Sequence, residues 1–83
     1  MKLADMLPDT PYKITKDNSD KSLVVGDIIS VDDDGINIWD GNDSGSFTPD
    51  DLKISSIVDF ECEDASDECE IVVTKWSKEF FRR

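Results

Sequence analysis

The dipeptide Asp34-Gly35 is the feature that most constrains how this chain folds. It lies between ISVDD and INIW, two short alternations of apolar and polar residues. An Asp-Gly pair suits a two-residue hairpin turn, because glycine reaches positive φ without strain. Placed at the centre of the turn, the pair brings Val31 opposite Ile38, with both side chains facing the core and Asn37 and Trp39 on the other face. The sequence therefore predicts an antiparallel hairpin.

Short strand patterns lie on both sides of this hairpin. Apolar and polar residues alternate within residues 12–15, 23–31, 52–62 and 71–73. Gly26 indicates a bend within the second of these segments. Short helical turns are expected within residues 1–10, after Thr48 and in the basic aromatic tail 77–83. Residues 1–83 are thus predicted to form one mostly β domain: a small antiparallel barrel of five or six strands, or a strongly bent sheet.

The composition argues against catalysis. Histidine, the usual general base and the commonest transition-metal ligand, is absent. The chain also lacks a glycine-rich phosphate loop, a nucleophile motif and the spacing of zinc ligands. We therefore predict a binding protein, not an enzyme, with no cofactor.

Acidic residues are concentrated in the middle of the chain. The formal net charge is −11, but residues 32–70 contain 14 acids against Lys53 alone, whereas residues 71–83 sum to +3. Such a chain repels free nucleic acid and anionic membranes, so we expect a protein partner with a basic surface. Alternatively, the acidity only keeps a small protein soluble. The sequence shows no secretion signal and no apolar run long enough to cross a bilayer, which predicts a cytoplasmic location.

The segment EDASDE suggests how the acids are arranged. If it closes a hairpin with Cys62 opposite Cys69, then Glu61 faces Glu70 and Glu63 faces Glu68, although facing like charges destabilise a sheet. Rows of carboxylates can imitate the phosphates of DNA, which would explain such an arrangement. The cysteines would be free, buried thiols, or a bridge in an oxidising setting. The predicted partner-binding acids are Asp32, Asp33, Asp40, Asp43, Asp50, Asp51, Glu61, Glu63, Glu68 and Glu70.

The stretch DGNDSGSFTPDD allows two interpretations. Its spacing approximates a calcium-binding loop with oxygen ligands from Asp40, Asn42, Ser44 and Asp51. Against calcium, an aspartate stands at the last position, where the motif has glutamate, and the preceding segment is typical of a strand. The other interpretation is a loop that ends in a helical turn capped by Thr48. It needs no metal.

The tail KWSKEFFRR also has two interpretations. Its aromatic residues, Trp76, Phe80 and Phe81, are predicted to close one end of the barrel. Alternatively, they form an exposed docking tail for another protein.

The segments LVVGDIISV, INIW and FTPDDL, with the Asp-Gly turn, resemble a small barrel of the Src homology 3-like type over residues 23–73. The short acidic chain also resembles small proteins encoded by bacteriophages and prophages. These resemblances imply a barrel with a helical turn before its last strand, and an inhibitor that mimics DNA to block a basic surface on a host protein. The alternative function is a structural or adaptor module that binds through its edge strands and tail.

Overall fold

The computed structural model describes residues 1–41 and 45–83. Over these residues the chain forms seven β-strands and three helical segments of three or four residues each. In chain order they are η1 (Leu3–Asp5), β1 (Tyr12–Lys16), β2 (Ile28–Asp32), β3 (Gly35–Asp40), β4 (Gly45–Phe47), η2 (Asp51–Lys53), α1 (Ser55–Val58), β5 (Glu61–Asp64), β6 (Cys69–Val73) and β7 (Lys78–Arg82). The prediction of a mostly β fold is confirmed, and none of the described helices is long and apolar enough to span a membrane.

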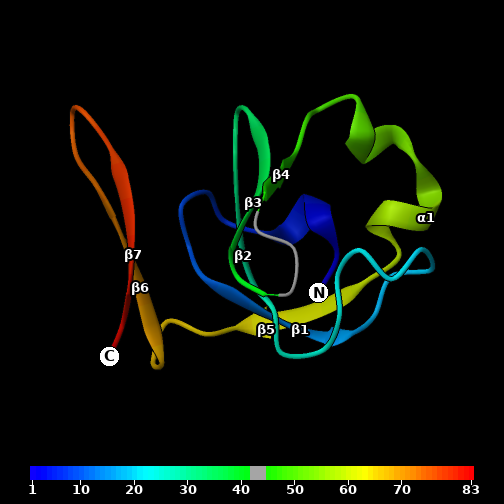
Figure 1. Ribbon diagram of the computed structural model, residues 1–83, viewed down its shortest axis with the longest axis horizontal. Helices are drawn as coiled ribbons and strands as arrows, with labels where there is room; N and C mark the ends of the chain where they lie inside the picture. Colours follow the sequence, from blue (N-terminus) through cyan, green and yellow to red (C-terminus); the bar gives the residue numbers. More distant parts are fainter. Residues whose placement is uncertain (42–44) are drawn as a thin grey trace.

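The strands form two antiparallel sheets. The larger sheet has the order β4-β3-β2-β1-β5, and the smaller sheet is the β6-β7 hairpin. Figure 1 shows this hairpin standing beside the larger sheet, with the C-terminus at its lower end. Within the described residues, β4 and β5 are the two edges of the larger sheet. Closure into a barrel therefore stays a prediction.

The hairpin at the Asp-Gly pair is confirmed, but its predicted register is wrong by two residues. Val31 pairs with Ile36, and Ile38 pairs with Ile29. The pair that closes the turn is Asp32 and Gly35, and the Asp34 N–H donates to the Asp32 carboxylate at 2.8 Å. A shift of two residues keeps every side chain on its predicted face, because side chains alternate along a strand.

Two hydrophobic clusters hold the fold together. The first is the main core, and it includes Tyr12, Ile14, Ile29 and Ile36. The second contains Ile28, Ala65 and Cys69, with Trp39 and Phe80 packed against it. Because Ile28 and Ile29 are neighbours in β2, the two clusters lie on opposite faces of the larger sheet. The β6-β7 hairpin thus covers the face opposite the main core.

Other predictions of local structure are wrong. The strand predicted over residues 52–62 is a 3-10 turn followed by the helix α1, and only residues 61–64 form a strand. The tail 77–83, predicted to be helical, forms β7. Gly26, with a φ of 100°, lies in a turn before β2 and not inside a strand.

Candidate protein-binding surface

Acidic side chains gather around Lys13 on β1, the strand next to the edge strand β5. Glu63 lies directly opposite Lys13 in the pairing of β1 with β5. A turn follows β5, and it is held by the amides of Glu68 and Cys69, which both donate to the Ala65 carbonyl, at 2.9 and 3.0 Å. Lys13 Nζ then lies 3.0 Å from Glu68 Oε1 and 3.8 Å from Glu63 Oε1. We call the exposed acids of this region the Lys13 patch: Glu61, Glu63, Asp64, Asp67 and Glu68.

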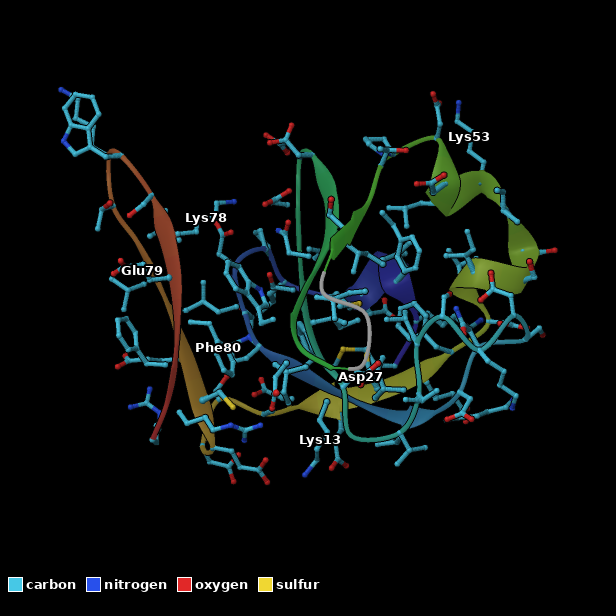
Figure 2. All side chains as sticks on the ribbon, in the orientation of Figure 1. Lys13, Asp27, Lys53, Lys78, Glu79 and Phe80 are labelled. Atoms are coloured by element: carbon cyan, nitrogen blue, oxygen red, sulfur yellow. The ribbon has the colours of Figure 1, made fainter. Side chains whose placement is uncertain are left out.

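The electrostatics of the Lys13 patch are dominated by negative charge. The hydrogen bond and the charge of Glu68 raise the pKa of Lys13, with smaller contributions from the charges of Glu63 and Asp67. Three carboxylates thus act on one ammonium group. In Figure 2, the Lys13 side chain points away from the β1 and β5 ribbons toward solvent. The patch therefore keeps an excess of negative charge.

The predicted hairpin that would place Cys62 opposite Cys69 is wrong. β5 pairs with β1, and β6 pairs with β7, so Cys62 lies opposite Ile14 and Cys69 opposite Arg82. The predicted rows of facing glutamates are consequently absent: Glu61 lies opposite Lys16, and Glu70 lies opposite Phe81. A glutamate opposite a lysine stabilises a sheet. The observed strand pairing therefore does not contain the repulsion between facing glutamates that was predicted to destabilise the sheet.

Both cysteines are free and buried. Cys62 belongs to the main core, and Cys69 belongs to the second cluster. Burial raises the pKa of each thiol, which keeps it protonated and poorly reactive at neutral pH.

A second acidic cluster surrounds Lys78, the first residue of β7, next to the turn of the β6-β7 hairpin. Lys78 Nζ lies 2.5 Å from Asp32 Oδ2 and 2.9 Å from Asp9 Oδ1. The Asp32 carboxylate also accepts hydrogen bonds from the Asn37 amide group and the Asp34 N–H. A pocket of about 340 Å³ at this cluster is lined by Pro8, Asp9, Asp32, Asp33, Asp34 and Lys78. The hydrogen bond from Lys78 lowers the pKa of Asp32, and the two carboxylates raise the pKa of Lys78.

Three of the other predicted partner-binding acids form ion pairs within the chain. Asp40 pairs with Arg82, Asp50 with Lys53 at 3.3 Å, and Glu70 with Arg83 at 3.8 Å. Within the described part of the chain, Asp33 and Glu61 form no ion pair, and both are exposed. Asp43 lies outside the described residues. The nine predicted acids that the structure describes are therefore distributed over several clusters and do not form one continuous row.

The capped turn after Thr48 is confirmed. The Thr48 N–H donates to Asp51 Oδ2 at 2.9 Å, and the Asp51 N–H donates to Thr48 Oγ1 at 3.3 Å, as in a capping box. Asp51 is thus used as a capping group, and Asp40 as the partner of Arg82. The other proposed calcium ligands, Asn42 and Ser44, lie outside the described residues, so the calcium site stays a hypothesis. Among residues 1–41 and 45–83, no three acidic or thiol groups are arranged to hold a metal ion.

The aromatic residues of the tail divide between the two predicted roles. Phe80 stacks on Trp39, with 6.3 Å between ring centroids, and helps to bury the second cluster. Trp76 is 86% exposed at the tip of the β6-β7 hairpin, and Phe81 is 46% exposed. The tip is ordered by Thr74, whose N–H donates to the Ser77 carbonyl and whose hydroxyl accepts from the Ser77 N–H. Phe80 therefore has a structural role, and Trp76 is available for contact with another molecule.

Sequence reasoning missed the cations at the centres of both acidic clusters. Lys13 and Glu68 are 55 residues apart, and Lys78 and Asp32 are 46 residues apart. The one local signal was the alternation of Lys13 with Tyr12 and Ile14, which placed its side chain on the outer face of a strand. Asp9, which has a φ of 55°, gave no signal.

The ion pair between Asp32 and Lys78 leads to a prediction about pH. Because the fold lowers the pKa of Asp32, its ion pair stabilises the protein above the ordinary aspartate pKa of about 4, and this stabilisation is lost as the pH falls through the lowered value. Asp32→Asn should be less stable than wild type at pH 7. The difference in free energy of unfolding should shrink below about pH 4. Urea titrations across this pH range check the prediction, and a constant difference would contradict it.

Comparisons of the chain with protein-family models, with curated proteins and with solved structures found no match.

Proposed function

We propose that this protein is a non-enzymatic binding factor whose acidic surface occupies a basic surface on another protein, of the kind that binds nucleic acid. The observation that carries the proposal is the Lys13 patch, where Glu63, Asp67 and Glu68 act on a single lysine. Residues 61–70 contain six acids and no lysine or arginine. Lys13 and Lys16 of β1 lie opposite Glu63 and Glu61, and Arg83 pairs with Glu70, so three cations compensate only part of the charge of these six acids.

Internal ion pairs do not remove the attraction to a basic partner. An exposed ion pair contributes little to stability, roughly 0 to 1 kcal/mol, and its members can exchange partners. The field at a distance depends on the sum of charges, which is −11 for the chain. Complementary charge on a partner then increases the association rate and selects against acidic competitors. Two clusters with negative excess support binding to a basic protein.

The finer parts of the proposal come from resemblance. A small barrel of the Src homology 3-like type, an origin in a bacteriophage or prophage, and action in the cytoplasm together form a consistent picture of an inhibitor. In this picture the carboxylates take the place of DNA phosphates on the host protein. Mimicry of this kind requires that DNA and the acidic protein compete for one site.

Charge reversal in the Lys13 patch tests the proposal. Asp67 is exposed and has no ion pair within the described residues, so Asp67→Lys should change the charge of the patch without affecting the fold. The partner is first captured from a bacterial lysate and purified. Its Kd should then rise about tenfold for Asp67→Lys at low salt, equivalent to about 1.4 kcal/mol, and the effect should diminish in 0.5 M salt because screening shortens the range of the attraction.

The matched control is Glu79→Lys. Glu79 is exposed on β7, far from Lys13 in Figure 2, and the substitution changes the net charge by the same amount. It should alter Kd less than twofold. Double-stranded DNA should displace the partner from the wild-type protein. Equal effects of the two substitutions, or a complex that neither salt nor DNA weakens, would contradict the proposal.

A second candidate function is an adaptor that binds through the tip of the β6-β7 hairpin. It is favoured by Trp76, which combines 86% exposure with a turn that is ordered by Thr74. Large aromatic side chains in ordered, exposed positions are frequent at the centres of protein interfaces. For an adaptor of this kind, Trp76→Ala would abolish partner binding, whereas Asp67→Lys and added salt would have little effect.

A further inference from the structure

β5 is an edge strand with outward-facing backbone groups. The Ala65 N–H donates to the Pro11 carbonyl, and Glu63 lies opposite Lys13, so alternate residues of β5 bond to β1. The N–H and C=O groups of the residues between them, Cys62 and Asp64, must point away from β1. The terminal amino group of the chain reaches the Cys62 carbonyl at 3.4 Å from that outer side. An unpaired edge of this kind can accept another strand.

An apolar pocket of about 580 Å³ lies next to the start of β5. Its apolar lining comes from the N-terminal segment and from the end of α1 onward: Met1, Leu3, Ala4, Val58 and Phe60. Charged residues of both signs surround it: Lys2, Lys16, Asp59 and Glu61. When a strand adds to a sheet edge, backbone hydrogen bonds supply affinity and an adjacent pocket supplies selectivity.

The side chains of β5 define which strand would fit. Glu61 and Glu63 are exposed on one face, while Cys62 between them is buried on the other. Acidic residues on an edge strand oppose pairing with acidic strands, because like charges directly opposite each other are destabilising. They favour a strand that places lysine or arginine opposite them. The residues between these basic residues of the added strand would face the side of the sheet that carries the apolar pocket.

We propose that β5 accepts an extended segment of the basic partner, in which lysine or arginine alternates with apolar residues. The basic side chains lie opposite Glu61 and Glu63, the backbone bonds to Cys62 and Asp64, and one apolar side chain occupies the pocket beside Phe60. The added strand displaces the contact of the terminal amino group with Cys62. This inference rests on the proposed function and specifies how the partner is bound.

A synthetic peptide that alternates lysine and valine, with blocked ends, is the probe. Hydrogen exchange measured by NMR should slow at the Cys62 and Asp64 amides when the peptide is added, since these amides gain acceptors. A peptide with glutamate in place of lysine should not bind. A peptide with glycine in place of valine keeps its charge but not its strand pattern, and it should bind at least tenfold more weakly. Equal binding of the lysine-valine and lysine-glycine peptides would overturn strand addition while leaving the charge-based function intact.

Asp64→Pro tests the backbone contact directly. Proline removes the outward N–H of Asp64, and edge strands tolerate proline at such positions. The substitution also removes the hydrogen bond from the Ser66 N–H to the Asp64 carboxylate, so Asp64→Ala is the matched control. Peptide affinity should fall about tenfold more for the proline variant than for the alanine variant. Equal losses would contradict the proposal. If the proline variant does not fold, a peptide N-methylated at the residues that bond to β5 gives the same comparison.

Discussion

Gly35→Ala is expected to lower the free energy of unfolding by about 3 kcal/mol or more. Gly35 is the first residue of β3 and has a φ of 115°, a conformation that strains any residue with a Cβ. A Cβ at this position would lie 1.8 Å from the Phe47 carbonyl oxygen, which belongs to the backbone of β4. Since backbone cannot rotate away as a side chain can, β4 has to move from β3. Urea denaturation of the purified variant measures the loss.

Two other glycines provide controls for this prediction. Gly26 also has positive φ, but an added Cβ would meet no atom of residues 1–41 and 45–83 within 4 Å, so Gly26→Ala should lose only about 1 kcal/mol from backbone strain. A Cβ at Gly45 would contact nothing in the described part of the chain, and the φ of Gly45 lies outside the left-handed region, so Gly45→Ala should change stability by less than about 0.5 kcal/mol. Similar losses for Gly35→Ala and Gly26→Ala would show that the close approach of β4 is unimportant.

Asn18→Ala is expected to lower the free energy of unfolding by about 2 to 4 kcal/mol. Asn18 is fully buried, and its amide group donates to the Ile57 carbonyl at 3.1 Å and to Ser22 Oγ at 2.8 Å. Its side-chain oxygen accepts from the Leu23 N–H at 2.9 Å. Alanine would leave the Ile57 carbonyl and the Leu23 N–H without this partner in the interior. Such unsatisfied groups are more costly than the average loss of a hydrogen bond.

The control for Asn18 is Asn37→Ala. Asn37 is only half-buried, and its side chain donates one hydrogen bond, to Asp32 Oδ2 at 2.9 Å. Because Asp32 keeps Lys78 as a partner, the expected loss is about 1 kcal/mol. Thermal unfolding followed by circular dichroism ranks the two variants. A larger loss of stability for Asn37→Ala than for Asn18→Ala would contradict the prediction that the buried hydrogen bonds of Asn18 to Leu23 and Ile57 are the more important ones.

The sequence was sufficient for elements whose signal is local. Turn chemistry and alternation together predicted the β2-β3 hairpin, and the alternation of Tyr12 and Ile14 predicted β1. The segment 52–62 was predicted wrongly because its apolar residues fit two spacings. The residues at even positions alternate as in a strand, but Ile54, Ile57 and Phe60 are three residues apart, as in a helix. The structure buries Ile57, an odd position, and thereby favours the helix α1. Tertiary packing decides between two such periods in a short segment.

The tail was predicted wrongly for a related reason. Trp76 and Phe80 are four residues apart, which is compatible with a helical turn, but Lys78, Phe80 and Arg82 also alternate as in a strand. Their partners are Asp32, Trp39 and Asp40, all distant in sequence. Similarly, the acids of the candidate surface were visible in the sequence, whereas their distribution around Lys13 and Lys78 depends on which strands pair. Strand pairing between β1 and β5 is a long-range property.

The attachment of the β6-β7 hairpin has a consequence for cooperativity. Among the described residues, the two sheets share no backbone ladder, and side-chain contacts such as Trp39 with Phe80 and Asp32 with Lys78 join them. Units joined in this way can open separately, with a free energy below that of global unfolding. The hairpin is then one cooperative unit and the five-stranded sheet another. Substitutions at the joining side chains would change how strongly the two units unfold together, even where the sheets themselves stay intact.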